Sequence, residues 1–218
     1  MATVAAVYTG QGLAETINTL FREVLPSHRL VNLMDDSIIH DVVREGGITR
    51  PVIRRLLEYY RIAADMGADL VVNTCSSVGE VAELGRQIVD IPILRIDEPM
   101  VLEAVGKYRN IGVLATLATT LGPTVRLLRS QAHRIEKEVS LTEGLADGAY
   151  HALVRGDPEG HDLLIEAEAQ QVAEKADCIL LAQGSMGRIR ERLEAATGKP
   201  VLASPDLCLR HIASILGG

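Results

Sequence analysis

One stretch of this sequence occurs twice, and the repeat limits what the chain can fold into. Residues 68–79 read ADLVVNTCSSVG, and residues 176–187 read ADCILLAQGSMG. Each copy has an Ala-Asp start, an apolar run, a serine and a closing glycine. A short apolar run that ends in a turn is typical of a buried parallel strand. The chain is therefore predicted to build the same strand and turn in each of two halves.

A second pair of segments extends the repeat. Residues 4–10 and 111–117 are both apolar runs with a threonine near their end, and each precedes its copy of the first repeat by nearly the same distance. Thr9 and Thr116 are the corresponding threonines. Buried strands resemble one another by chance, but two matched pairs at almost one offset favour an internal duplication.

Strand-like and helix-like patterns alternate along the whole chain, which is typical of βαβ units and a parallel sheet. The predicted strands are 4–8, 29–33, 70–73, 91–96, 111–115, 133–139, 178–182 and 201–203. The predicted helices are 12–24, 49–66, 77–89, 120–131, 163–176, 186–197 and 206–216. We expect an α/β protein made of two pseudo-symmetric, doubly wound parallel-sheet halves, with the site in the cleft between them. The first half is predicted to comprise residues 1–98 with a C-terminal helix at 206–218, and the second half residues 99–205.

Composition excludes several classes of function. The net charge is −7, aromatic residues make up 3% of the chain, and no basic stripe occurs, which argues against a nucleic-acid surface. No apolar stretch is long enough to cross a membrane, and no signal peptide is evident, so a cytoplasmic protein without a membrane partner is expected. The three cysteines show no metal-ligand spacing and are predicted to be reduced thiols.

Cys75 is the cysteine best placed for a chemical role, because it closes a strand and opens a helix. Backbone N–H groups and the positive end of a helix favour a thiolate at such a place. The alternative is a buried turn cysteine without a chemical role. The polar neighbours of Cys75 favour the functional interpretation. In the second copy of the repeat, Gln183 occupies the position that corresponds to Cys75.

The turns after the strands are rich in hydroxyl and amide groups, which suit a carboxylate and an enediolate formed from it. N-capping of the following helices would explain the same residues, and the two roles are compatible. The predicted substrate-binding residues are Thr9, Asn73, Thr74, Ser76, Ser77, Thr116, Thr119, Gly184 and Ser185.

Other patterns carry weaker signals. Residues 8–12 contain Gly-x-Gly after a strand but lack the third glycine of a dinucleotide site. His151 and the pair His161-Asp162 are candidates for a proton relay, although a surface or helix-start role explains them equally well. Arg50, Arg54 and Arg55 are expected on a solvated helix face.

Three motifs resemble those of the aspartate/glutamate/hydantoin racemase superfamily: residues 73–76 (NTCS), residues 111–119 (IGVLATLAT) and residues 180–186 (LLAQGSM). The resemblance spans most of the chain. It implies two similar α/β halves, a small carboxylate substrate, no cofactor and a homo-oligomer. It also implies two cysteines on either side of the substrate α-carbon, one of which removes a proton while the other returns one. Cys75 matches the first cysteine, and Gln183 stands where the second is expected.

The departure at Gln183 leaves the reaction open, because an amide cannot accept and return a proton near neutral pH but can donate a hydrogen bond. Cys75 could act alone as acid and base in a racemase or epimerase, with another group or water on the far face. It could protonate the enediolate left by loss of CO2, as a carboxy-lyase. It could attack a double bond as a nucleophile. A non-catalytic protein that binds a small carboxylate is the alternative from a different class.

Overall fold

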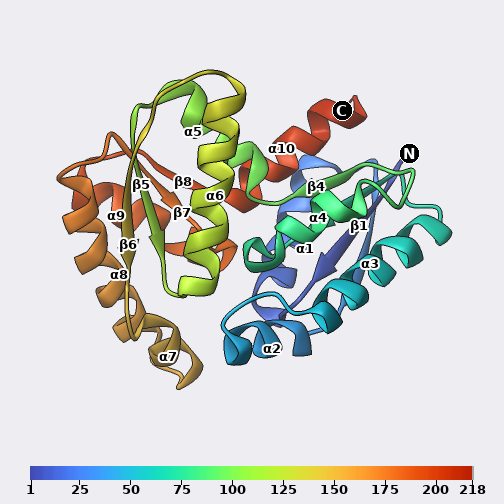
Figure 1. Ribbon diagram of the computed structural model, residues 1–218, viewed down its shortest axis with the longest axis horizontal. Helices are drawn as coiled ribbons and strands as arrows, with labels where there is room; N and C mark the ends of the chain where they lie inside the picture. The colour runs from blue at the N-terminus through green and yellow to red at the C-terminus, as the bar shows by residue number, and fades with distance from the viewer. Residues whose placement is uncertain (218) are drawn as a thin grey trace. The chain divides into compact units, whose positions relative to one another are not determined.

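The computed structural model describes residues 1–217, which form two compact units, each built around its own four-stranded parallel sheet (Figure 1). One unit comprises Met1–Pro99 and the residues from Pro205 onward, and the other comprises Met100–Ser204. The predicted fold class, two parallel-sheet α/β halves, is confirmed.

In the first unit the strand order is β2-β1-β3-β4, and all three pairings are parallel. The strands are β1 Thr3–Tyr8, β2 Arg29–Met34, β3 Leu70–Asn73 and β4 Ile93–Arg95. The helices are η1 Gln11–Leu13, α1 Ala14–Val24, α2 Ser37–Glu45, α3 Arg50–Asp65, η2 Ser76–Val78 and α4 Glu80–Gly85, with α5 Glu98–Lys107 leading out of this unit and α10 Ser204–Leu216 returning to it.

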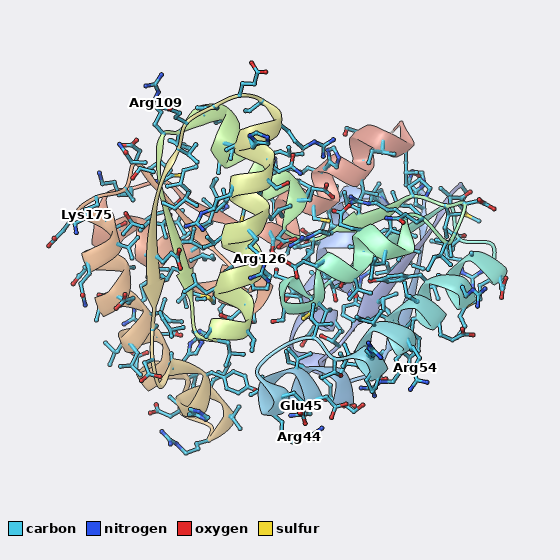
Figure 2. The ribbon with its side chains drawn as sticks, viewed as in Figure 1. Arg44, Glu45, Arg54, Arg109, Arg126 and Lys175 are labelled. Carbon is cyan, nitrogen blue, oxygen red and sulfur yellow. The ribbon has the colours of Figure 1, made fainter. Side chains whose placement is uncertain are left out.

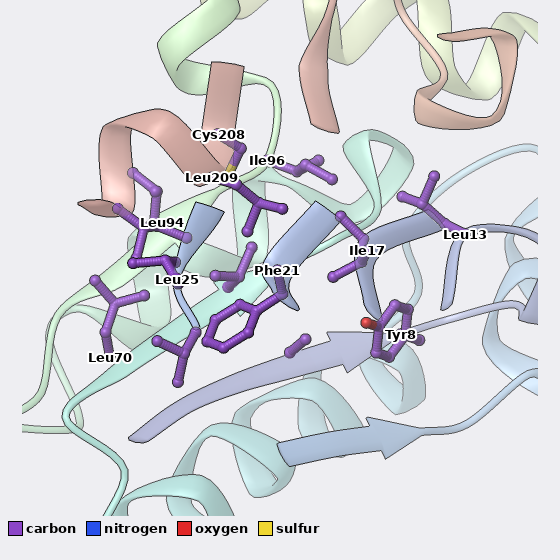
Figure 3. Close-up of a cluster of buried hydrophobic side chains, with 14 residues drawn as sticks. Tyr8, Leu13, Ile17, Phe21, Leu25, Leu70, Leu94, Ile96, Cys208 and Leu209 are labelled. Atoms are coloured by element: carbon purple, nitrogen blue, oxygen red, sulfur yellow. The ribbon is translucent and has the colours of Figure 1, made fainter. Parts of the chain in front are cut away.

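Alternation along β1 divides the core of the first unit between the two faces of its sheet. Val4, Ala6 and Tyr8 belong to a cluster that α1 and α10 complete (Figure 3). Ala5 and Val7 belong to a second cluster, which α2, α3 and α4 complete. Because successive side chains point to opposite faces, a strand that is apolar at every position requires cover on both. This explains why β1 reads as a continuous apolar run.

The second unit repeats the arrangement, with the strand order β6-β5-β7-β8 and parallel pairing throughout. The strands are β5 Asn110–Ala115, β6 Ser140–Leu145, β7 Cys178–Leu181 and β8 Val201–Ala203. The helices are α6 Ala118–Arg134, α7 Ala149–Val154, α8 Pro158–Ala173, η3 Gly184–Ile189 and α9 Arg190–Thr197. Helices α8 and α9 complete an apolar cluster with β5, β7 and β8, while α6 packs on β5 and β6.

The repeated Ala-Asp pair has a structural cause in both units. The Asp69 carboxylate accepts a hydrogen bond from the backbone N–H of Thr3 at 2.7 Å, and the Asp177 carboxylate accepts one from Asn110 at 3.1 Å. Each aspartate thereby ties the start of one central strand to the start of its neighbour. The interaction satisfies a backbone donor at the amino edge of the sheet.

Several predicted elements are wrong. No strand forms at residues 133–139, because α6 continues to Arg134 and ends where Glu136 adopts a left-handed backbone with φ 53°. The strand at this place is β6, and it is largely exposed, so it lacks the apolar run by which buried strands are recognised. The sequence patterns also do not predict α2 or α5.

Gly112 in β5 lies where α8 approaches the sheet most closely. A Cβ atom there would be 2.4 Å from Cγ1 of Val172 and 3.2 Å from Cβ of Ala176. We expect Gly112→Ala to lower the free energy of unfolding by about 1–3 kcal/mol, since overpacking forces the helix away from the strand. Urea denaturation measures this loss. Gly106→Ala in α5 is the control, because nothing lies within 4 Å of its Cβ position, and it should cause no loss.

Candidate functional site

Cys75 lies directly after β3 and caps η2, the short helix that begins at Ser76. Its backbone is extended, with φ −120° and ψ 112°. Gln183 caps η3 after β7 with almost the same geometry, φ −109° and ψ 127°. The two residues that correspond in the sequence repeat therefore correspond in backbone conformation, each at the carboxyl end of a central strand. Ligands of open parallel sheets bind at this edge.

The surroundings of Cys75 act on its thiol in opposite directions. Burial raises the pKa of Cys75, and hydrogen bonds from the Thr9 hydroxyl, the backbone N–H groups of Ser77 and Val78, and the Ser77 hydroxyl lower it only in part. The predicted helix-end donors are thus present, but burial outweighs them and leaves the pKa of Cys75 above the usual value of a thiol. The residue rests as a neutral thiol, because a partly buried sulfur loses more hydration than these donors replace. The residue as a whole is only partly buried.

Asn73 and Thr74 hold the turn in shape. The Asn73 side-chain oxygen accepts a hydrogen bond from the Cys75 N–H at 3.2 Å, and its nitrogen donates to the Val78 carbonyl at 3.2 Å. The Thr74 hydroxyl donates to the Val7 carbonyl at 2.9 Å. Both side chains are buried. Their contacts are those of residues that position Cys75, whereas the sequence predicts that they bind substrate.

The first unit brings together Thr9, Ser76 and Ser77 beside Cys75. All three are buried, and the Ser76 hydroxyl makes no hydrogen bond within residues 1–217. A buried hydroxyl without a partner costs about 1–3 kcal/mol of free energy. A ligand oxygen at this place would satisfy the Ser76 hydroxyl.

In the second unit, the side chain of Gln183 is hydrogen-bonded to Thr116 at both ends of its amide. The Gln183 Oε1 atom accepts hydrogen bonds from the Thr116 backbone N–H at 2.6 Å and from its hydroxyl at 3.1 Å, and the Gln183 Nε2 atom lies 2.8 Å from the same hydroxyl, to which it can donate. The backbone N–H can only donate, so it determines which end of the amide is the oxygen. One N–H of Gln183 therefore remains for another acceptor.

The other residues predicted for this turn differ in accessibility. The Thr119 hydroxyl in α6 is buried and makes no hydrogen bond to any described residue. Gly184 is partly buried, and Ser185 is exposed. Thr119 is thus the second predicted carboxylate ligand, besides Ser76, whose hydroxyl lacks a partner in the part of the chain that the structure describes.

A buried ion pair that the sequence does not reveal lies under the Cys75 turn. The guanidinium of Arg95 donates to both carboxylate oxygens of Asp97, at 3.0 and 2.8 Å, and the two side chains are 3% and 1% exposed. The same guanidinium lies against Gly79, where a Cβ atom would come within 2.6 Å of it. Gly79 follows η2 directly, so the ion pair supports the turn that presents its N–H groups to Cys75.

The proposed proton relay at His161 and Asp162 has a structural role in the second unit. The Asp162 carboxylate lies 2.7 Å from His161 Nδ1 and accepts two hydrogen bonds from Arg188 of η3, the one to Oδ2 at 2.8 Å. Burial raises the pKa of Asp162, but the hydrogen bonds from Arg188 and His161 outweigh it and leave the pKa lowered. The cluster joins α8 to η3, and His151 lies outside it on the surface of α7.

The arginines of α3 divide between solvent and ion pairs. Arg50 and Arg54 are exposed, and Arg54 points away from its sheet (Figure 2). Arg55 instead pairs with Asp35 at 3.2 Å and Asp41 at 2.6 Å. The described residues contain no cluster of three or more histidine, cysteine or acidic side chains that could hold a metal ion. No helix within residues 1–217 is long and apolar enough to span a membrane.

Comparison with known proteins shows which family and which solved structures this chain is similar to. The sequence profile of the Asp/Glu/Hydantoin racemase family matches residues 6–212. No curated protein sequence matches significantly. Glutamate racemase from Francisella tularensis, solved with D-glutamate, superposes with a TM-score of 0.80 at 14% identity, covering 99% of this chain and 81% of that one. Aspartate racemase from Picrophilus torridus superposes with 0.75 at 15% identity, covering 100% and 95%. Allantoin racemase from Klebsiella pneumoniae superposes with 0.71 at 16% identity, covering 100% and 88%.

Proposed function

Because the chain belongs to the Asp/Glu/hydantoin racemase family, we propose that it is a cofactor-independent isomerase of the racemase or epimerase type. It acts at the carbon α to a carboxylate, and Cys75 is its acid and base. The observation that carries this proposal is the environment of Cys75: a partly buried residue at the carboxyl end of β3, with the donors of Thr9, Ser77 and Val78 around its sulfur. Such donors stabilise the thiolate that must form during the reaction.

The proposed step moves one proton and one electron pair. The Cys75 thiolate accepts the proton from the α-carbon, and the electron pair of the broken C–H bond moves into the carboxylate to give an enediolate. Return of the proton from the thiol regenerates the substrate carbon. The unpartnered hydroxyl of Ser76, in the turn after Cys75, is the donor that we assign to the carboxylate and its enediolate, because fixed donors stabilise charge that develops in the transition state.

Gln183 limits the proposed reaction to one proton-transferring side chain. Its amide cannot exchange a proton near neutral pH, and its oxygen is already engaged by Thr116. We assign to Gln183 a single hydrogen bond from Nε2 to the developing charge. Cys75 is then the only side chain of the pair that moves a proton, and water or another group must serve the opposite face of the α-carbon for inversion to occur.

A carboxy-lyase is the second candidate, favoured by the raised pKa of Cys75. Loss of CO2 breaks a C–C bond and leaves its electron pair on the α-carbon as an enediolate. The neutral thiol of Cys75 then donates its proton to that carbon, and solvent reprotonates the sulfur. A resting thiol is the protonation state that this step needs.

Incubation with small α-substituted carboxylates in D2O separates these functions. Deuterium incorporation at the α-carbon, followed by NMR and chiral chromatography, supports the isomerase. CO2 release from substituted malonates supports the carboxy-lyase. Thermal stabilisation by a carboxylate with neither signal would indicate a non-catalytic binding protein. The predicted domain boundaries, cytoplasmic location and homo-oligomer remain predictions.

We expect Gln183→Glu to slow α-proton exchange about a hundredfold, because it removes the Nε2 donor while keeping an acceptor for Thr116. The melting temperature should change less than in Gln183→Leu, which leaves the buried Thr116 N–H without this partner. Exchange rates and melting temperatures of the two variants measure these effects. Full exchange activity in Gln183→Glu would show that Gln183 has no part in the chemistry.

A further inference from the structure

The two copies of the repeated turn differ in the side chains that lie beneath them. In the first unit, Asn73 of β3 and Arg95 of β4 are partners in the parallel register. The corresponding partners in the second unit are Leu181 of β7 and Ala203 of β8. A polar and charged pair of positions in one unit thus matches an apolar pair in the other. Because the second unit forms the same strand and turn on apolar side chains, the fold of the turn does not by itself require Arg95.

Stability is also a weak explanation for the ion pair that Arg95 forms. Arg95 and Asp97 are 3% and 1% exposed. Burying two charges costs free energy that their mutual attraction offsets only when the geometry is good, and apolar residues of similar volume often stabilise a fold as well or better. A buried guanidinium below the Cys75 turn therefore needs an explanation beyond stability.

Arg95 contacts the turn at Gly79. A Cβ atom at Gly79 would lie 2.6 Å from Cζ, Nε and Nη2 of the guanidinium, whereas a Cβ atom at Gly187, the corresponding glycine, would lie 3.5 Å from Cβ of Ala203. Gly79 has a right-handed helical backbone, with φ −54° and ψ −34°, which alanine adopts more readily than glycine. The close approach of Arg95, and not the backbone conformation, is what requires a glycine here.

The segment that rests on this contact is the one that carries Cys75. The Val78 N–H donates to the Cys75 carbonyl at 3.2 Å. Asn73, the strand partner of Arg95, accepts from the Cys75 N–H and donates to the Val78 carbonyl, both at 3.2 Å. Asn73 and Arg95 therefore hold the turn of residues 75–79 from two neighbouring strands, Asn73 by hydrogen bonds and Arg95 by its contact with Gly79.

We propose that Arg95 is a positioning residue, which holds the turn of residues 75–79 through Gly79 and so keeps the N–H groups of the turn directed at the Cys75 sulfur. The donors to this sulfur include the N–H groups of Ser77 and Val78, the two residues before Gly79. A displacement of a few tenths of an ångström at Gly79 weakens these hydrogen bonds. Arg95 acts on Cys75 only through this turn. Its role deepens the proposed function and rests on it.

The test is the substitution Gly79→Ala, read out by alkylation of Cys75 with iodoacetamide as a function of pH. Mass spectrometry of the peptide that contains Cys75 distinguishes it from the two buried cysteines. The midpoint of the profile reports the stability of the thiolate, which is the reactive form, and the plateau at high pH reports access to the sulfur.

We expect the midpoint in Gly79→Ala to move up by about one pH unit, so that alkylation at neutral pH is about tenfold slower. The new methyl group and the guanidinium cannot both keep their places. Arg95 cannot yield easily, because Asp97 accepts hydrogen bonds from it at 3.0 and 2.8 Å, so the turn must move. An unchanged midpoint would overturn the inference, whatever happens to the melting temperature, because the contact would then serve the fold alone.

Gly187→Ala is the matched control. It adds the same methyl group at the corresponding place of the second unit, where the distance of 3.5 Å to Ala203 is an ordinary van der Waals contact. The alkylation profile and the melting temperature should both stay in place. A displacement of the midpoint equal to that in Gly79→Ala would contradict the role of Arg95.

The double variant Arg95→Met/Asp97→Leu tests the same contact from the other side and gives an answer if Gly79→Ala does not fold. It removes the guanidinium without leaving an unpaired charge, so most of the stability should be retained. The midpoint should nevertheless move to higher pH, because a flexible methionine does not fix Gly79. Gly79→Ala keeps both charges, so a displacement in both variants assigns the effect to the contact rather than to the charge. Retained stability with an unchanged midpoint in the double variant would overturn the inference.

These measurements separate the inference from the proposed function. Alkylation requires no substrate, so its result does not depend on whether the protein turns over a carboxylate. Absence of α-proton exchange in the unaltered protein would count against the isomerase alone.

Discussion

Cys75→Ser is expected to slow α-proton exchange by about a thousandfold or more, with little change in melting temperature. A serine hydroxyl has nearly the shape of the thiol but is far too weak an acid to shuttle a proton near neutral pH. Positioned acid–base groups contribute about 10²–10⁴ in rate. The measurement is deuterium incorporation at the α-carbon of the best substrate, followed by NMR. If the protein is instead a carboxy-lyase, the same variant lacks the thiol that protonates the enediolate. Its turnover of substituted malonates should then fall as well.

Cys178→Ala is the matched control. Cys178 is buried at the amino end of β7, where burial raises its pKa to about 12. It behaves as a small apolar side chain, so its removal should lower stability slightly and leave exchange intact. Exchange that survives in Cys75→Ser, or disappears equally in Cys178→Ala, would refute the assignment of Cys75.

Arg95→Met is expected to lower the free energy of unfolding by about 3–5 kcal/mol, because it leaves the Asp97 carboxylate buried without its partner. It also removes the planar group that lies against Gly79 below the Cys75 turn. Urea denaturation of the purified protein at neutral pH measures the loss. Such a change is large compared with the total stability of most domains.

The double variant Arg95→Met/Asp97→Leu tests the cause of that loss. It removes both charges, so it should recover most of the stability that the single variant loses. If the double variant is as unstable as the single one, loss of arginine packing rather than an unpaired charge is responsible. A single variant as stable as the unaltered protein would show that the pair contributes nothing to the fold.

The sequence predicted the parts of the fold that depend on local pattern. The apolar runs of β1, β3, β5 and β7 are buried on both faces, and such strands are visible in a sequence as uninterrupted runs. Strand β6 was missed because its outward-facing polar residues interrupt the run. The duplication was also visible, since each copy keeps the aspartate that joins two central strands.

The candidate site was predictable in position but not in its electrostatics. The place of Cys75 and Gln183 after corresponding strands follows from the repeat alone. The protonation state of Cys75 does not, because it depends on how much water the surrounding helices remove from the sulfur. Arg95 was overlooked because it stands in a short buried strand, and only the fold around it shows that Asp97 neutralises it there.

The order of residues therefore determined the two-sheet architecture and the loss of the second thiol, because hydrophobic periodicity and side-chain identity are properties of the chain itself. Tertiary structure alone decided which polar atoms have partners. Gln183 is held by Thr116, while the hydroxyls of Ser76 and Thr119 make no hydrogen bond within residues 1–217. Hydrogen bonds between distant residues depend on distances and angles of a few tenths of an ångström, which only the packed chain sets.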